Sequence, residues 1–280
     1  MIIWIASYPK SGNTYLRSFI SSYYFSKKGK FDFDLLLNIL QFPSTKFTKK
    51  NLYSNLEASQ NWIYNQNQFF GGEKINFVKT HNSLCEFKGN KFTTNDQTLG
   101  AIYIVRDPRN VITSLSNHNQ LNFDQALEFM TNSKKYLINK KNINNFANFT
   151  FLSSWSEHYK SWKNNKQFKN FFLKYEDLEK NPIETFKEII LFINKILKKD
   201  NVIDMDKVKK IVESISFDKL KKEEQESGFP EAVTDKNKKK INFFYLGKKN
   251  KWDKILTNHQ INLLNRKFKD DLINLKYKIQ

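Results

Sequence analysis

The stretch Met1-Ile-Ile-Trp-Ile-Ala-Ser-Tyr-Pro-Lys-Ser-Gly-Asn-Thr-Tyr-Leu-Arg-Ser18 contains the pattern that decides the fold. Residues 1–6 are apolar and rich in β-branched side chains, which predicts a buried strand, and residues 9–13 break that run. From Thr14 onward apolar residues recur at helical spacing, which predicts an amphipathic helix. A strand, a Gly-containing turn and a helix N-terminus together form an anion site, because the first helical amides have no intrahelical acceptor.

The side chains of this turn also suit an anion. Lys10 adds a positive charge, Gly12 lets the backbone approach a ligand closely, and the hydroxyls of Ser11 and Thr14 add donors. The turn is not the nucleoside triphosphatase loop, because there the Lys follows a Gly, whereas here Lys10 precedes Gly12.

Length and charge limit the class of protein. A chain of 280 residues accommodates one large α/β domain spanning residues 1–280. The formal net charge of +19 favours an anionic partner, which is a nucleic acid, a membrane surface or a highly charged nucleotide. The basic residues are scattered along the chain, whereas a nucleic-acid module more often concentrates them.

The single cysteine fits a reducing compartment, and the hydropathy of the chain predicts no transmembrane segment. Cys85 is the only cysteine, so the chain has no internal disulfide, and we expect this residue to be a small buried side chain. No apolar run is long enough to span a bilayer, and residues 1–6 are too short for a secretory leader. We therefore expect a cytoplasmic protein without a transmembrane segment.

A second chemical motif follows the apolar strand predicted at residues 75–78. Lys79 and His81 are two residues apart at this strand end, so their side chains are expected on the same face, toward the crevice where open α/β sheets bind ligands. An imidazole in that place can take a proton from a hydroxyl. The other histidines, His118, His158 and His259, have no such context and are expected to be surface or packing residues.

A third apolar strand, residues 100–105, precedes Arg106. Asp107 and Pro108 predict a helix start, with an N-cap acceptor and a ring fixed in helical φ. Ser114 then lies two turns into the helix, where its hydroxyl and the guanidinium of Arg106 can meet on one phosphate. The alternative for Arg106 is a salt bridge with Asp107 or with another helix acid.

The remaining elements alternate between strands and helices. A fourth strand is expected at residues 171–175, and an aromatic stripe at Trp155, Tyr159 and Trp162 is expected in the core. Helices are expected at residues 31–42, 52–70, 122–139, 182–197, 204–214 and 217–225 and after the capping box at 257–260. The predicted fold is a P-loop-like, three-layer α/β/α domain with a central parallel sheet.

Five segments, taken in order, resemble the motifs of sulfotransferases that use 3′-phosphoadenosine 5′-phosphosulfate (PAPS). They are the loop at residues 8–15, the Lys79-Thr-His81 motif, the pair Arg106 and Ser114, the turn Tyr175-Glu-Asp-Leu178, and the segment 243–252. Two of them depart from the family pattern. Tyr15 stands where a Trp normally stacks on adenine. In the last segment Tyr245 and Leu246 replace an Arg-Lys pair, and Asn250 replaces the second Gly.

The resemblance implies sulfuryl transfer from PAPS to a hydroxyl or amine, which leaves 3′-phosphoadenosine 5′-phosphate (PAP). His81 would be the catalytic base, and Lys10 and Lys79 would stabilise the developing charge. It implies PAPS as co-substrate and no metal. The implied nucleotide-binding residues are Lys10, Ser11, Gly12, Asn13, Thr14, Tyr15, Arg106, Ser114, Tyr175, Gly247 and Lys248.

The sequence does not identify the acceptor: its aromatic content is compatible with a phenol, a lipid or a sugar, and the resemblance implies a hydroxyl or an amine. Residues 84–99, 139–148 and 227–240 are polar, irregular segments and are expected to contact the acceptor. No pattern in the sequence indicates an oligomeric state.

Two other functions stay open at this point. A P-loop nucleotide kinase would use the same fold, but it needs a Lys after the loop Gly and a Mg²⁺ site, and Gly12 is followed by Asn13. A catalytically inactive relative that binds nucleic acid or another polyanion would explain the charge without chemistry.

Overall fold

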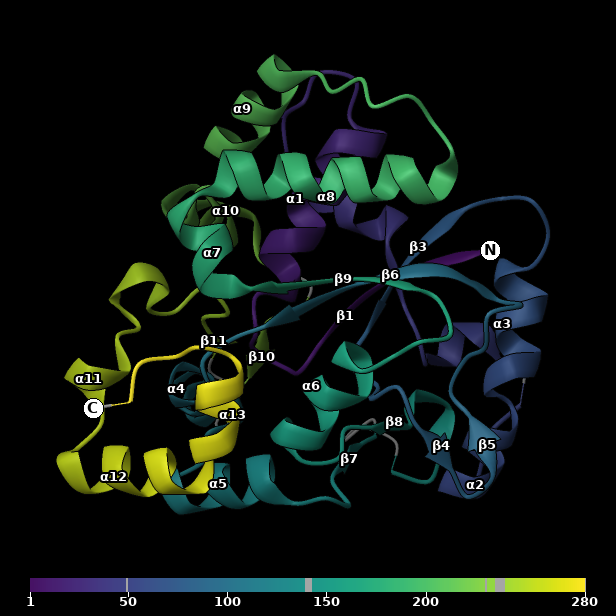
Figure 1. Ribbon diagram of the computed structural model, residues 1–280. Coiled ribbons are helices and arrows are strands. Elements are labelled where there is room, and N and C mark those ends of the chain that lie inside the picture. Colours follow the sequence, from purple (N-terminus) through teal and green to yellow (C-terminus); the bar gives the residue numbers. More distant parts are fainter. Residues whose placement is uncertain (49, 139–142, 230, 235–239, 280) are drawn as a thin grey trace.

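A five-stranded parallel sheet forms the centre of the molecule (Figure 1). The computed structural model describes residues 1–48, 50–138, 143–229, 231–234 and 240–279. The sheet has the order β2-β3-β1-β6-β9, and every neighbouring pair is parallel. Its strands are β1 (Ile2–Ser7), β2 (Leu40–Gln41), β3 (Asn76–Thr80), β6 (Thr98–Val105) and β9 (Lys169–Lys174).

Helices cover both faces of the sheet, as expected for strands that are apolar on both sides. All six residues of β1 are buried, and alternate residues enter different cores: Ile3 and Ile5 pack on one side, Ile2 and Trp4 on the other. The predicted three-layer α/β/α fold with a central parallel sheet is therefore confirmed.

One helical layer packs on the face of Ile3 and Ile5. It contains α1 (Asn13–Phe25), η1 (Phe33–Asn38), α8 (Pro182–Leu197), α9 (Met205–Ser214) and α10 (Phe217–Ser227). The helix α7 (Tyr175–Lys180) joins β9 to α8.

The other layer packs on the face of Trp4. It contains α2 (Asn55–Gln60), α3 (Trp62–Phe70), α4 (Pro108–Asn119), α5 (Phe123–Thr131), α6 (Trp155–Lys163), α12 (Asn258–Lys267) and α13 (Lys269–Asn274). The expected aromatic stripe on α6 lies in this core, where Trp155, Tyr159 and Trp162 are each buried.

Short elements complete the chain. They are β4 (Glu86–Phe87) with β5 (Asn90–Lys91), β7 (Tyr136–Leu137) with β8 (Thr150–Phe151), β10 (Val233–Thr234) with β11 (Lys240–Ile241), the 3-10 turns η2 (Thr45–Phe47), η3 (Phe146–Asn148) and η4 (Gly247–Lys249), and α11 (Trp252–Ile255).

Several helix predictions were too long. The segment 31–42 forms only η1 and then β2, whose Leu40 pairs with Val78 of β3. The segment 122–139 ends its helix at Thr131, because Leu137 pairs with Thr150 in a two-stranded ladder. In each case strand pairing with a distant segment overrides the local helical period.

Other helix boundaries also differ from the prediction. The segment 52–70 divides into α2 and α3, and the last helix divides into α12 and α13 near Phe268. Residues 84–99, expected to be irregular, contain the β4–β5 hairpin and the start of β6. Residues 139–142, 230 and 235–239 of the two other expected loops lie outside the described residues.

Adjacent parallel strands bring the motifs together at one edge of the sheet. β1, β3, β6 and β9 all run in the same direction, so the segments that follow them emerge side by side. These segments begin at Tyr8, His81, Arg106 and Tyr175. The candidate site therefore lies at the carboxyl edge of the sheet, beside the N-terminus of α1.

Candidate functional site

The loop between β1 and α1 has a backbone that only certain residues adopt. Lys10 and Gly12 have φ of 67° and 98°, and a Cβ on Gly12 would overlap the ring of Tyr175. Gly12 is therefore required both for its conformation and for the space that it leaves. The hydroxyl of Ser11 is buried and has no partner among the described atoms. An unpartnered buried donor beside a helix N-terminus fits an anionic ligand.

Three predicted nucleotide-binding residues begin α1, and they differ in what they contact. The side-chain amide of Asn13 donates to the carbonyl of Ile5 at 3.1 Å and to the hydroxyl of Ser7 at 3.2 Å, so it fastens the helix start to β1. Thr14 is buried, and the ring of Tyr15 lies edge-on to Phe186 with centroids 5.6 Å apart. The structure thus gives Asn13 a part in holding the loop.

The ammonium of Lys10 lies in a desolvated position. Its Nζ is 3.9 Å from the centre of the Phe243 ring, a cation–π contact with the C-terminal segment. Burial lowers the pKa of Lys10 to about 8, with Arg106 and Lys79 acting in the same direction and Glu231 opposing them. Lys10 therefore lies among other cations, as a residue that receives an anion would.

The Lys79 and His81 side chains lie at the end of β3, as predicted. Nδ1 of His81 is 2.8 Å from the carbonyl oxygen of Ser7, and because a carbonyl only accepts, Nδ1 carries the proton. Nε2 is then the unprotonated nitrogen. Burial, with a smaller contribution from Lys79, lowers the pKa of His81 to about 3, so the ring is neutral at physiological pH.

His158 is a buried packing residue, within the range expected for it, and it also contacts the backbone of His81. It is fully buried on α6, where Nε2 donates to the carbonyl of His81 at 3.0 Å and Nδ1 accepts from the hydroxyl of Tyr103 at 2.7 Å. The hydrogen bond from Nε2 fixes the backbone carbonyl of His81 against α6. The contact joins residues 77 apart in sequence, and no local pattern around His158 announces it.

Arg106 lies where β6 ends, and its neighbours differ from the alternative considered for it. Asp107 pairs with Arg109 at 2.7 Å and caps α4 through the Arg109 amide. The guanidinium of Arg106 instead stacks on the ring of Tyr175, 4.3 Å from its centre, and donates to the Lys10 carbonyl at 3.3 Å. Its Nε has no partner among the described atoms, so Arg106 retains a donor.

Ser114 is engaged by the C-terminal segment. Its hydroxyl accepts from the side-chain amide of Asn250 at 2.8 Å, while Oδ1 of Asn250 accepts from Thr113 at 2.6 Å. Asn250 thus uses the position of the family's second Gly to attach the segment to α4. The expected meeting of Ser114 with Arg106 on one phosphate stays a prediction.

The rest of the C-terminal segment packs against neighbouring helices. Gly247 has φ of 52°, and a Cβ there would overlap the ring of Phe217. The indole of Trp252 lies 3.9 Å from the guanidinium of Arg109. Lys248 is exposed on η4, and its predicted contact with the nucleotide stays a prediction.

The sequence patterns did not indicate two charged residues of the site, Arg17 and Glu231. Oε1 of Glu231 lies 2.6 Å from Nη1 of Arg17 and 3.0 Å from Nζ of Lys79. The side chains of Arg17 and Lys79 are almost completely buried, and each has 5% of its surface exposed. Both residues lie in ordinary sequence contexts, and 214 residues separate Arg17 from Glu231, so no spacing rule finds the pair.

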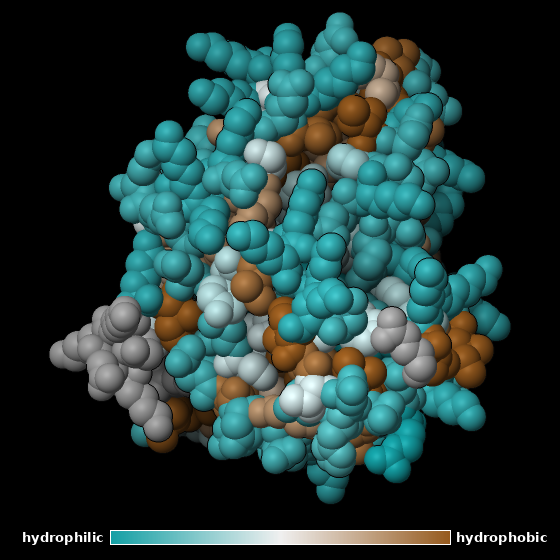
Figure 2. All heavy atoms as spheres, turned by 90° about the vertical axis from the view of Figure 1, so that its left-hand side faces the viewer, coloured by the Kyte–Doolittle hydropathy of each residue, from teal (hydrophilic) through white to brown (hydrophobic). Residues whose placement is uncertain are grey.

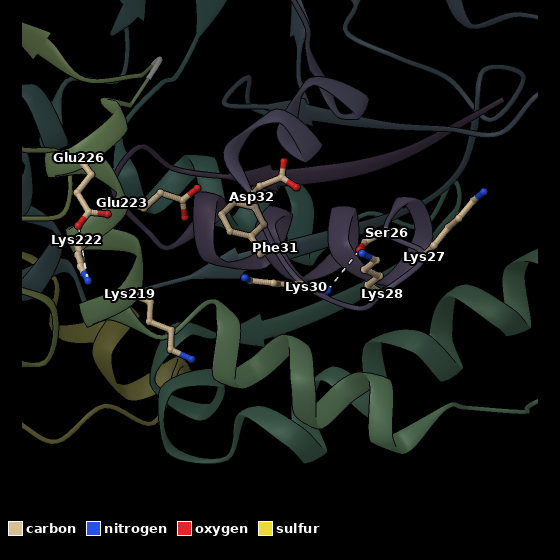
Figure 3. Close-up of a pocket in the computed structure, with 10 residues that line it drawn as sticks. All are labelled: Ser26, Lys27, Lys28, Lys30, Phe31, Asp32, Lys219, Lys222, Glu223 and Glu226. Atoms are coloured by element: carbon tan, nitrogen blue, oxygen red, sulfur yellow. Dashed lines mark hydrogen bonds and ion pairs between the residues drawn. The ribbon is translucent and has the colours of Figure 1, made fainter.

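The cavity in Figure 3 lies elsewhere, beside the C-terminal end of α1 and the helix α10. Its volume is 530 Å³, and its lining residues are Ser26, Lys27, Lys28, Lys30, Phe31, Asp32, Lys219, Lys222, Glu223 and Glu226. Lys222 is paired with Glu226 at 3.6 Å. Both acids and bases line this cavity, and none of its lining residues belongs to the predicted site.

A metal-binding cluster and a membrane-spanning helix are both absent from the part of the chain that the structure describes. No group of three or more His, Cys, Asp and Glu side chains among them is placed to hold a metal ion. None of the helices that the structure describes has both the length and the apolar composition to cross a membrane.

Figure 2 shows the face on the side of α11 and α12, where hydrophilic side chains predominate and apolar areas are small.

Comparison with known proteins decides the family. The family model described as "Sulfotransferase domain" matches residues 2–276. The chain belongs to the sulfotransferase family. This finding confirms the resemblance carried by the five motifs, and it places the chain in an enzyme family that uses PAPS.

Two solved structures, each bound to PAP, share the fold. Retinol dehydratase in complex with androsterone and inactive cofactor PAP is 18% identical, with a TM-score of 0.59 over 97% of this chain and 80% of that one. Mouse sulfotransferase SULT7A1 complexed with PAP is 20% identical, with a TM-score of 0.58 over 96% of this chain and 83% of that one. A search of curated protein sequences found no match.

Proposed function

We propose that this sulfotransferase moves the sulfuryl group of PAPS to a hydroxyl or amine of a small-molecule, lipid or sugar acceptor, with His81 as the general base. The observation that carries the proposal is the geometry around His81. Its Nδ1 proton is held by the Ser7 carbonyl at 2.8 Å, and Lys79 and the α1 loop lie on adjacent strands. A neutral imidazole, fixed in one tautomer beside a cluster of cations, suits proton removal next to an anionic donor.

The residues of the loop fit the donor. The unpartnered Ser11 hydroxyl, the free Nε of Arg106 and the amides of the α1 N-terminus are donors without acceptors. α1 has no acidic residue in its first turn, so its dipole attracts an anion unopposed. We assign the 5′-phosphosulfate to Lys10, Ser11, Gly12 and Thr14, and the 3′-phosphate to Arg106 with Ser114 and Lys248.

The chemistry assigned to each side chain follows from its charge. The donor brings an activated sulfuryl group, and Nε2 of His81 takes the acceptor proton as the new S–O or S–N bond forms. Lys10 and Lys79 stabilise the negative charge that grows on the leaving phosphate. Lys79 is a smaller cause of the low pKa of His81 than burial is, and Glu231, which pairs with Lys79, acts in the opposite direction.

Calorimetric titration with PAP tests the nucleotide site. We expect PAP to bind tightly, and Arg106→Ala to weaken it at least tenfold, since a charged hydrogen bond contributes about 1.5–3 kcal/mol. ATP with Mg²⁺ and a random DNA duplex serve as controls for the kinase and nucleic-acid alternatives. Binding of ATP or DNA with no binding of PAP would contradict the proposal.

Turnover of His81→Ala tests the base. With PAPS and an acceptor found by screening phenols, alcohols and amines, we expect a rate roughly a hundredfold lower and PAP affinity nearly unchanged. Turnover equal to that of the unmodified protein would remove His81 from the mechanism.

A further inference from the structure

The carboxylate of Glu231 occupies a position that suits the donor's own anion. One oxygen, Oε1, contacts both Nη1 of Arg17 and Nζ of Lys79, at 2.6 and 3.0 Å. Arg17 belongs to α1, one turn after the anion-binding loop, and Lys79 belongs to β3, two residues before His81. Glu231 itself comes from the segment between α10 and β10. A negative group from far along the chain thus lies between two cations beside the base.

The surroundings of this carboxylate carry more positive than negative charge. Lys10 is close enough to Glu231, Lys79 and Arg106 for each of them to influence its pKa. The Nε of Arg17 is buried and has no partner among the described atoms, while Nη1 donates to Glu231. Arg17 therefore has a buried donor that the Glu231 carboxylate does not satisfy.

Nearby aromatic side chains place the Glu231 segment against the same loop. Phe229 contacts Phe243, with ring centres 4.7 Å apart, and Phe243 in turn covers Nζ of Lys10. The chain itself thus covers the two lysines assigned to the donor: the ring of Phe243 covers Lys10, and the carboxylate of Glu231 pairs with Lys79. An incoming phosphosulfate must contact the same ammonium groups.

We propose that Arg17 and Lys79 form an anion subsite of the donor pocket, and that Glu231 is its internal ligand, which the anionic 5′ group of the nucleotide displaces, the phosphosulfate in PAPS and the phosphate in PAP. The proposal rests on the proposed function for the identity of the donor. It adds Arg17 to the donor-binding residues and makes Glu231 a residue that sets donor affinity. Only the molecules in which Glu231 has left the subsite can then bind the donor. The apparent dissociation constant is therefore the intrinsic constant divided by the fraction of such molecules.

The test compares Glu231→Gln with Glu226→Gln. Gln keeps the size of the side chain and one acceptor oxygen, while the charge that competes with the donor is removed. Glu226 is an exposed residue of α10 that pairs with Lys222 at 3.6 Å, so its substitution makes the same change in net charge away from the subsite. If Glu231 occupies the subsite about nine-tenths of the time, its removal tightens PAP binding about tenfold.

We measure PAP binding at about 50 mM and about 500 mM NaCl. The higher salt screens long-range electrostatic repulsion between Glu231 and PAP, whereas direct competition of the two for the same cations persists at both concentrations. At least fivefold tighter binding by Glu231→Gln at both concentrations, with Glu226→Gln unchanged, supports the proposal. Unchanged or weaker binding by Glu231→Gln overturns it, because a carboxylate that merely holds its segment in place would give that result. A gain that disappears at the higher salt also overturns it. Should the Gln variant not fold, Glu231→Asp, whose shorter side chain cannot reach both cations equally, is judged by the same criteria.

Inorganic sulfate separates this proposal from the proposed function. If no variant binds PAP, the donor assignment fails, and the subsite is judged by thermal unfolding in sodium sulfate against NaCl of equal ionic strength. A larger rise of Tm for Glu231→Gln than for the unmodified protein supports the anion subsite. An equal or smaller rise overturns it.

Discussion

Binding of PAP is expected to weaken steeply as the pH rises from 7 to 9. Burial lowers the pKa of both Lys10 and Lys79 to about 8, against about 10.5 for an exposed lysine. The nucleotide's phosphates are already ionised above pH 7, since their second pKa is about 6. The two ammonium groups are therefore the parts of the proposed donor site that change charge in this range.

The size of the effect follows from the fraction of each lysine that is charged. With a pKa of about 8, about nine-tenths of each side chain is protonated at pH 7 and about one-tenth at pH 9. An anion binds the protonated form, so the contribution of each lysine is present below pH 8 and is lost above it. The dissociation constant should rise by up to about tenfold for one lysine and about a hundredfold for two that act independently.

Calorimetry at pH 7, 8 and 9 measures this rise, and buffers of different ionisation enthalpy measure the protons taken up at pH 8. Lys10→Met removes one of the two groups, so its dissociation constant should be higher at pH 7 but should change only about tenfold between pH 7 and 9. Equal dissociation constants of the unmodified protein at pH 7 and pH 9 would refute the argument, since they would mean that neither lysine loses its proton there or that neither contacts the nucleotide.

Three substitutions test other parts of the site. Asn250→Ala removes the hydrogen bonds that attach the C-terminal segment to α4, and we expect urea unfolding to show a loss of roughly 1–2 kcal/mol, whereas no loss would mean that the segment is held by other contacts. His158→Leu leaves the Tyr103 hydroxyl without its buried partner and should cost roughly 2–4 kcal/mol in the same assay; an unchanged midpoint would contradict this. Gly12→Ala places a methyl group against the ring of Tyr175 at a positive φ and should weaken PAP binding at least tenfold; unchanged affinity would show that the loop adapts.

The parts of the fold that the sequence predicted are those with local causes. Asp107 caps α4 through the amide of Arg109 with Pro108 at the first helical position, as that dipeptide predicts. The box at Thr257 and Gln260 likewise begins α12. Four strands of the central sheet, β1, β3, β6 and β9, were predictable because burial on both faces demands continuous apolar runs.

Prediction was wrong where a short segment takes its conformation from a distant partner. Leu40 and Leu137 both fit a helical period, yet each lies in a strand because it pairs with another strand. Two-residue strands carry almost no periodicity of their own, so their conformation depends on the available edge of a neighbouring strand. His158 was expected to be a surface or packing residue, and its contact with the carbonyl of His81 was not predictable because it depends on how α6 packs against the sheet.

The site itself shows why motifs alone do not describe an anion pocket. The motifs located the cations Lys10, Lys79 and Arg106, because each lies directly at a strand end or a helix start. They gave no means of locating the counter-charge, since Glu231 reaches Arg17 and Lys79 through tertiary packing. Buried cations without a partner are costly, so a chain that gathers them must also supply an anion whenever its ligand is away. Glu231 meets that requirement, and the pairing that stabilises the free protein is, on our proposal, the one that its donor must break.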